Sequence, residues 1–346
     1  MKKNLSPHIS PAWHFPTALL SLLLMLFVPL GCADDDEAES GRATVKMIFT
    51  TRASAQADGQ TQLADRERMK TLRVIMENAN TGKILYNVFY DNLQNVTQKV
   101  ITFQDVLVED KDGTPFNFYA IANEASFLQG GESLDGKNID LTYLYNRDLN
   151  IDFNTTNLPL PQAKKNQKVI LPVKETQTHT VQMEFPVAKV CVNFTNEIEA
   201  KQEIENIHIP GLKATGGKLF PQDFDPQGVV EETVPDAATN AEYIAFTPNP
   251  LPITPGTYGG PLGEGAVTPL YVYPAKSTTG NYLLNATWNG EKSLNLNGNG
   301  LLADGIRRGM QLNIGIALKY GVMQLSGLSV TVDNWTTATP LTPEFQ

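Results

Sequence analysis

The chain has 346 residues, 41% of them hydrophobic, and a formal net charge of −10 at pH 7. This length accommodates two domains of ordinary size, each with a substantial core. The acidic balance argues against a nucleic-acid-binding protein, because such proteins carry basic faces.

The amino terminus has the pattern of a lipoprotein leader. An apolar run, Ala18–Leu30, follows two early lysines and ends at Gly31-Cys32. The run is too short to span a bilayer and suits the apolar part of a secretory signal. We therefore predict a signal peptide over residues 1–31 and lipid attachment at Cys32, which would tie the mature chain to a membrane. The alternative is an ordinary cleaved signal followed by a solvated acidic linker.

Short strands separated by turns dominate the rest of the chain. Residues Ala43–Thr50 indicate an early strand, and Thr51–Met69, which has no apolar period, indicates an exposed loop. A hairpin-like pair follows, Thr71–Glu77 and Lys83–Tyr90, around the turn at Asn80–Gly82. Further strands are predicted at Gln98–Phe103, Phe116–Ala122, Lys168–Val173 and Thr180–Phe185.

The pattern restarts around Phe185-Pro186, so we place a domain boundary near residue 184. Glycine- and proline-rich segments punctuate the strands, and the sequence shows no long amphipathic helix. These features predict an all-β protein of β-sandwiches, with one domain over 53–184 and a second over 185–346. The strands expected in the second domain are Val187–Phe194, Glu203–Ile209, Glu242–Phe246, Leu270–Tyr273, Tyr282–Trp288, Gln311–Leu318 and Leu325–Val332.

Sequence signals of catalysis are poor. Two of the four histidines lie in the leader, which leaves His179 and His208 for the mature chain. The sequence contains no HExxH, CxxC, P-loop or GxSxG pattern. The acidic run Glu109–Asp112 matches no EF-hand spacing, and we interpret it as a solvated face. We therefore predict that the protein is not an enzyme and uses no cofactor and no metal.

Two further groups of residues have a structural interpretation. With Cys32 lipidated, Cys191 has no disulfide partner, and its place in a predicted strand indicates a small hydrophobe rather than a reactive thiol. A set of aromatic residues could form a platform on which sugars stack, but most sit in predicted strands, which favours core packing. The set comprises Tyr271, Tyr273, Tyr282, Trp288 and Trp335.

Several short motifs occur in an order that matches a known family. A lipoprotein leader with an acidic run, an early strand and an arginine-containing loop precede Leu72–Met76. Further motifs are Phe118–Glu124, Val187–Val190, Tyr271–Pro274 and Val330–Trp335. In this order they resemble the type V pilins, the fimbrillins that build surface fimbriae of anaerobic Gram-negative bacteria. The resemblance covers the whole chain.

This resemblance implies a fold and an assembly route. Each member of the family consists of two transthyretin-like (Ig-like Greek-key) β-sandwich domains in tandem. An early strand fills the first sandwich until an arginine-specific protease on the cell surface cuts the loop after it. The strand then leaves, and a terminal strand of the next subunit enters the vacated groove, where it gains backbone hydrogen bonds and apolar contacts.

Mapped onto this chain, the resemblance implies that residues 32–52 are an acidic tether and propeptide, with Ala43–Thr50 as the plug strand. Val45, Ile48 and Phe49 are among the apolar groups of that strand. Full burial of one such side chain is worth roughly 1.5–3 kcal/mol.

The cleavage expected from the family falls after Arg52, before Ala53. Arg66 and Arg68 are alternative positions in the same loop, and all three could also be ordinary loop arginines.

The carboxyl tail, Thr336–Gln346, is the candidate donor strand, with Leu341 and Phe345 as groove anchors. Its two prolines cannot donate to a β-ladder. The donor strand could therefore begin earlier, near Leu328, or the chain could be an accessory or tip subunit.

The expected function is that of a structural subunit of a fimbria, as a shaft, accessory or tip pilin, at the outer membrane and cell surface, supporting adhesion. Its expected partners are other fimbrial subunits, the membrane through the lipid, the arginine-specific protease, and a host protein or glycan. Two alternatives stay open: an uncleaved fimbrial anchor, and a monomeric surface lipoprotein that binds glycans.

Overall fold

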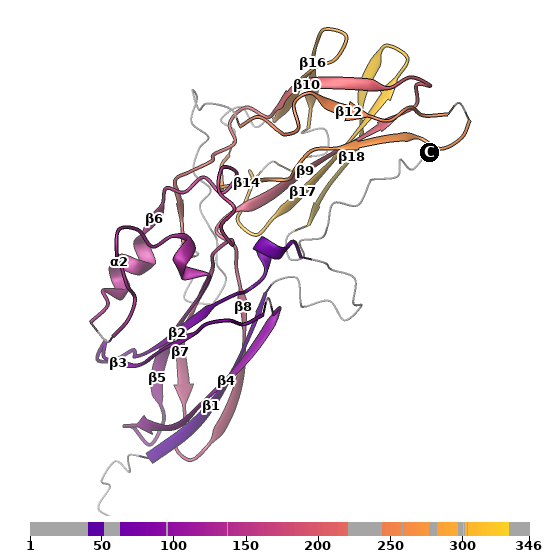
Figure 1. Ribbon diagram of the computed structural model, residues 1–346. Coiled ribbons are helices and arrows are strands. Elements are labelled where there is room, and N and C mark those ends of the chain that lie inside the picture. The colour runs from indigo at the N-terminus through magenta and orange to yellow at the C-terminus, as the bar shows by residue number, and fades with distance from the viewer. Residues whose placement is uncertain are drawn as a thin grey trace, which may run out of the picture. The chain divides into compact units, whose positions relative to one another are not determined.

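Strands form most of the structure, which is a computed structural model (Figure 1). It describes residues 41–51, 63–94, 96–136, 138–220, 244–257, 259–276, 282–296, 300, 302 and 304–331. The all-β class predicted from the turn-rich sequence is confirmed. Helix is limited, among these residues, to the short α2 (Leu141–Asn146) and two 3-10 turns, η2 (Asp65–Glu67) and η3 (Glu124–Ser126).

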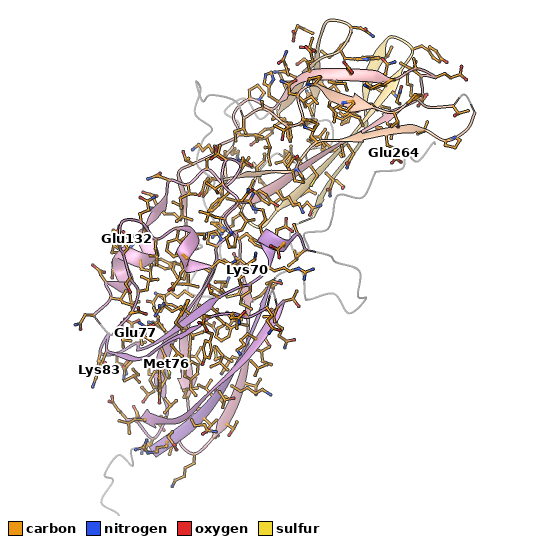
Figure 2. All side chains as sticks on the ribbon, in the orientation of Figure 1. Lys70, Met76, Glu77, Lys83, Glu132 and Glu264 are labelled. Carbon is orange, nitrogen blue, oxygen red and sulfur yellow. The ribbon has the colours of Figure 1, made fainter. Side chains whose placement is uncertain are left out.

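The first part of the chain folds into two sheets, which we call the first sheet pair. One has the strand order β4-β1-β8 and the other β3-β2-β5-β7. Apolar side chains from both sheets, Met76 among them (Figure 2), form one core cluster, so the two sheets face each other as a sandwich. The strands are β1 (Gly41–Thr51), β2 (Leu72–Asn78), β3 (Ile84–Tyr90), β4 (Gln98–Val108), β5 (Thr114–Ala122), β7 (Gln162–Leu171) and β8 (Thr176–Met183).

The later part of the chain forms a second sheet pair around its own core. Its sheets have the orders β12-β10-β15-β16 and β13-β9-β17-β18, with β14 also paired to β9. Alternate residues of β9 and β17 supply much of this core. The strands are β9 (Ala188–Asn196), β10 (Gln202–His208), β12 (Leu251–Ile253), β13 (Gly263–Ala266), β14 (Leu270–Val272), β15 (Leu283–Thr287), β16 (Glu291–Asn295), β17 (Gln311–Lys319) and β18 (Val322–Thr331).

A third core cluster joins residues of both parts of the chain. Tyr119 and Ile121 of β5 point away from the first sandwich core and pack in this cluster with Phe185, Phe220 and Tyr273. A two-stranded sheet of β6 (Asp148–Leu149) and β11 (Gly217–Lys218) also links the two parts. This shared core accounts for all described residues falling in one compact unit. The domain boundary near residue 184 remains a prediction.

β1 and β9 hold corresponding places in their sheets. β1 pairs antiparallel with β4 and parallel with β8. β9 pairs antiparallel with β13 and β14 and parallel with β17. The second arrangement has one addition, because β18 pairs antiparallel with the far side of β17.

Two sequence predictions of secondary structure were wrong in detail. No strand occurs over the described residues of Glu242–Phe246, where Ala245 forms only an isolated bridge with His208. The predicted exposed loop Thr51–Met69 ends in a buried segment, since Leu63, Glu67 and Met69 are at most 4% exposed. The strand expected at Thr71–Glu77 and its hairpin partner are confirmed as β2 and β3.

Cys191 lies in the middle of β9 and is 1% exposed, which confirms its expected role as a small hydrophobe. Burial raises the pKa of its thiol to about 11. In the chain carrying Cys32→Ser, we expect Cys191 of the folded protein to react with a disulfide reagent at pH 8 at least ~100-fold more slowly than in the urea-unfolded chain. Equal rates in the two states would show that this strand is open to solvent.

Candidate functional site

The candidate functional site is the slot that β1 occupies in the first sheet pair. β1 lies between β4 and β8 (Figure 1), in register with β4 from Gly41 to Thr50 and with β8 from Thr44 to Thr51. β4 and β8 do not pair with each other in this sheet. β1 therefore pairs with the backbone N–H and C=O groups along the facing edges of β4 and β8. Without β1, each of these edges would present a row of unpaired groups.

Side chains of β1 alternate between the core and the outer face, as a half-buried strand requires. Ala43, Val45, Met47 and Phe49 are at most 4% exposed and belong to the core cluster of the first sheet pair. Lys46 is exposed on the opposite face. Every second residue of a strand in this slot therefore packs its side chain into the core, and these four side chains of β1 now fill those places.

The apolar residues named from the sequence do not all share one face of β1. Val45 and Phe49 point into the core together with Met47, whereas Ile48 is only half-buried. Strand parity explains this, since residues two apart share a face and Ile48 is out of phase with the others.

The walls and floor of the slot come from strands far apart in sequence. β4 and β8 line the sides, and the facing sheet closes the bottom, so a strand that fills the slot touches both layers of the sandwich. The lining side chains from these elements are Ile101, Phe103, Val106, Val108, Val181, Met183, Val74, Met76, Phe116 and Phe118.

The start of β1 is held by a close backbone approach. A Cβ atom added at Gly41 would lie 2.0 Å from Cγ1 of Val173, which is closer than two carbon atoms can approach. Next to it, the Arg42 guanidinium donates a hydrogen bond of 2.9 Å to the carbonyl of Asp105, and the Lys174 amide donates one of 2.8 Å to the Arg42 carbonyl. A side chain at residue 41 would therefore require Val173 to move.

Most of the residues selected from sequence fall outside the described part of the chain. These are the lipidation residue Cys32, the cleavage pair Arg52 and Ala53, and the tail anchors Leu341 and Phe345. β1 ends at Thr51, the residue before Arg52. The two alternative cleavage residues, Arg66 and Arg68, are described and lie in and directly after η2.

Arg66 is held firmly in folded structure. Its Nη2 donates to the Phe153 carbonyl at 2.7 Å, and its guanidinium carbon lies 4.9 Å from the ring centre of Tyr271. Its own carbonyl accepts a hydrogen bond of 2.7 Å from the Leu160 amide. Burial lowers the pKa of Arg66.

Glu67 is a buried charge that the sequence analysis did not single out. Its side chain is 0% exposed, and its Oε1 accepts from Lys189 Nζ and from the Tyr271 hydroxyl, both at 2.8 Å. Its Oε2 accepts from the Ala64 amide at 2.9 Å, and Gln162 Nε2 donates to its carbonyl at 3.1 Å. The segment that follows the expected cleavage loop is thus fixed to β7, β9 and β14.

The described members of the aromatic set considered as a sugar platform belong to the core. Tyr271, Tyr273, Tyr282 and Trp288 are at most 5% exposed, which confirms the core-packing interpretation, and Trp335 lies outside the described residues. Within the described ranges, no group of three or more acidic, histidine or cysteine side chains is arranged to hold a metal ion. None of the helices described here is long and apolar enough to cross a membrane.

Met47 and Ile48 make a matched pair of test positions in β1. In the uncut full-length chain, we expect Met47→Ala to lower the free energy of unfolding by about 2–5 kcal/mol, because it leaves a cavity in the core. Ile48→Ala should lower it by about 1 kcal/mol or less, because that side chain is half-exposed. Urea unfolding followed by tryptophan fluorescence measures both, and equal effects would contradict the assigned orientation of β1.

A substitution at Glu67 tests whether its contacts with Lys189 and Tyr271 stabilise the connection between the two parts of the chain. Glu67→Gln removes the buried carboxylate that accepts from Lys189 and Tyr271 and should destabilise the protein by about 3–5 kcal/mol. The exposed pair Lys201–Glu203 is the control, and Glu203→Gln should change stability by about 1 kcal/mol or less. Thermal unfolding of both variants checks this, and a Glu67→Gln protein as stable as the control would show that the buried pair is not needed.

Comparisons with known proteins bear on the fold. No protein-family model matches the chain, and no curated protein matches it in sequence. Among solved structures, the tip fimbrial protein Mfa3 from Porphyromonas gingivalis, with a C-terminal truncation, matches over 84% of this chain and 100% of its own, with a TM-score of 0.53 and 14% identity.

A candidate cell adhesion protein from Parabacteroides distasonis gives a similar result. The match covers 87% of this chain and 99% of that one, with a TM-score of 0.52 and 14% identity. Because the sequence identity is 14% in both comparisons, the similarity is one of fold alone. The sequence motifs predicted the fold of a fimbrial protein, and the chain has the fold seen in the fimbrial tip protein Mfa3.

Proposed function

We propose that this chain is a structural subunit of a fimbria at the cell surface and that it supports adhesion. The fold is shared with a protein described as a fimbrial tip protein and with one described as a candidate adhesion protein. The observation that carries the proposal is β1, a strand near the amino terminus that fills the middle of a three-stranded sheet. A plug of this kind suits a subunit whose fold is completed by another chain.

Assembly in this proposal proceeds by strand exchange. Burial of Val45, Met47 and Phe49 together contributes about 5–9 kcal/mol, so β1 stays in place while it is covalently attached. A cut after β1 makes it a separate peptide, and its departure exposes two strand edges and an apolar slot. A strand from a second copy recovers both the backbone hydrogen bonds and the apolar burial.

Cleavage is proposed after Arg52, before Ala53. β1 ends at the preceding residue, so a cut there frees the whole strand. Proteases act on segments that are accessible and extended. Arg66 is held by hydrogen bonds of its side chain and its carbonyl, and Arg68 directly follows the buried Glu67. Both are therefore poorer substrates for an arginine-specific surface protease.

The two ends of the chain complete the proposal. A lipid on Cys32 would carry the precursor to the outer membrane, and the tail with Leu341 and Phe345 would serve as the donor strand. The alternative donor start near Leu328 is less favourable, because Leu328 lies inside β18 and pairs there with Ile314 of β17. Its side chain packs against the core of the second sheet pair. To use it as a donor would require breaking that ladder.

The decisive experiment treats the full-length chain with an arginine-specific endoprotease and runs the product unboiled on a gel. We expect wild-type protein to give a ladder of oligomers, because cleavage opens the slot. Arg52→Ala should remain monomeric, whereas the control Arg68→Ala should form the ladder as wild type does. N-terminal sequencing of the oligomers should begin at Ala53.

Two outcomes would oppose strand exchange. If protein lacking residues 33–52 stayed monomeric, with no uptake of a synthetic peptide of residues 41–51, the slot would not be an assembly site. If material from sheared fimbriae retained a lipid-blocked Cys32 and an intact β1, the chain would be the fimbrial anchor instead.

A further inference from the structure

A cavity of about 610 Å³ lies away from the β1 slot, between segments from both parts of the chain. Its lining comes from η2 and the residues next to it, the loop before β7, β9, residues 244–247, and β14 with the loop leading to it. This volume lies within the range of sites that hold small molecules. The lining includes Arg66, Asp152, Thr247, Thr268, Pro269 and Leu270.

Arg66 places a positive charge in the wall of this cavity. Within the described ranges it forms no ion pair, and its buried Nε has no hydrogen-bond acceptor. Asp65 and Glu67 are the adjacent carboxylates in sequence, but Asp65 pairs with Lys70, and the oxygens of Glu67 already accept from Lys189, Tyr271 and Ala64. A half-buried guanidinium left without a carboxylate is a group that a ligand carboxylate can pair with in a charge-assisted hydrogen bond.

The rest of the lining combines hydroxyls, one carboxylate and an apolar wall. Thr155, Thr247 and Thr268 are exposed threonines around the cavity. Asp152 Oδ1 accepts from the amide and side chain of Asn154, which fixes the carboxylate and leaves Oδ2 free of any hydrogen bond to that residue. Ile244, Pro269 and Leu270 add apolar surface. This mixture suits a ligand with hydroxyls on one face and C–H groups on another.

We infer that this cavity binds an acidic sugar residue, of the uronic or sialic type. Arg66 pairs with the sugar carboxylate, Asp152 and the threonines bond its hydroxyls, and Pro269 with Leu270 contacts the apolar face of the ring. The inference deepens the adhesion role proposed above and rests on it. Many surface glycans end in an acidic sugar or contain one in each repeating unit, so such a sugar is a ligand that an adhesion protein can meet. It differs from the aromatic platform considered from sequence, whose described members are buried.

The test uses saturation-transfer NMR on the full-length, uncut chain. The probes are the methyl glycosides of glucuronic acid and of N-acetylneuraminic acid, with methyl glucoside as the neutral sugar and N-acetylglutamate as a carboxylate without a sugar ring. We expect saturable binding of at least one acidic glycoside, weakened by salt. Binding of the other two probes should be at least about ten-fold weaker, because each lacks one class of contact.

Two variants locate the binding. Thr268→Tyr places a large side chain at an exposed rim position and should abolish binding by filling the cavity. Arg66→Gln should weaken it about ten-fold or more by removing the charge-assisted bond. Arg307→Gln, which alters an exposed arginine outside the cavity, should bind as wild type does. Unfolding curves establish that each variant is folded, and Thr268→Tyr keeps the test decisive if Arg66→Gln is unstable.

Several results would overturn the inference. These are no binding of either acidic glycoside, binding unchanged in Thr268→Tyr, equal binding of methyl glucoside, or binding of N-acetylglutamate as strong as that of the sugars. Because the experiment uses uncut monomer, its failure leaves the oligomer ladder unaffected. A missing ladder with intact sugar binding would instead count against strand exchange alone.

Discussion

The first sheet pair depends on the hydrogen bonds that β1 makes on both of its edges. β4 and β8 are joined only through this strand in their sheet, and the core below it is closed by the side chains that β1 sends inward. A central strand is usually the most secure element of a sheet, since both of its edges are satisfied. Here the central strand is also the earliest one in the described chain, and the segment that follows Thr51 connects it to the other described strands.

The residues of η2, which come next in the described chain, are held firmly by contacts with both parts of the protein. Glu67 bonds Lys189 of β9 and Tyr271 of β14, and Arg66 adds contacts with Phe153 and the Tyr271 ring. Cutting the chain between β1 and η2 would therefore separate β1, which pairs with β4 and β8, from a segment held by both parts of the molecule. The polar contacts of Arg66 and Glu67 involve neither β4 nor β8, so they do not depend on β1.

The sequence allowed the class and many strands to be predicted, because hydrophobic alternation and turn residues are local signals. Within β1 the apolar residues alone do not identify the inward face, because Ile48 lies out of phase with Val45, Met47 and Phe49. The Glu67 cluster was missed for a different reason. Its partner Lys189 lies far along the chain, and nothing near Glu67 distinguishes a buried carboxylate from a solvated one. The acid-sugar cavity is likewise built from residues that only the fold brings together.

β1 and β9 hold corresponding places in their sheets, and the difference between them bears on how a fibre would grow by the proposed strand exchange. β9 is joined to the chain at both ends and is buried on both faces, and Lys189 ties it to Glu67, so one proteolytic event cannot free it. Under the strand exchange proposed above, each chain would therefore offer one acceptor slot and insert one tail strand. Subunits joined in this way would add only end to end, which would give an unbranched fibre whose two ends differ chemically.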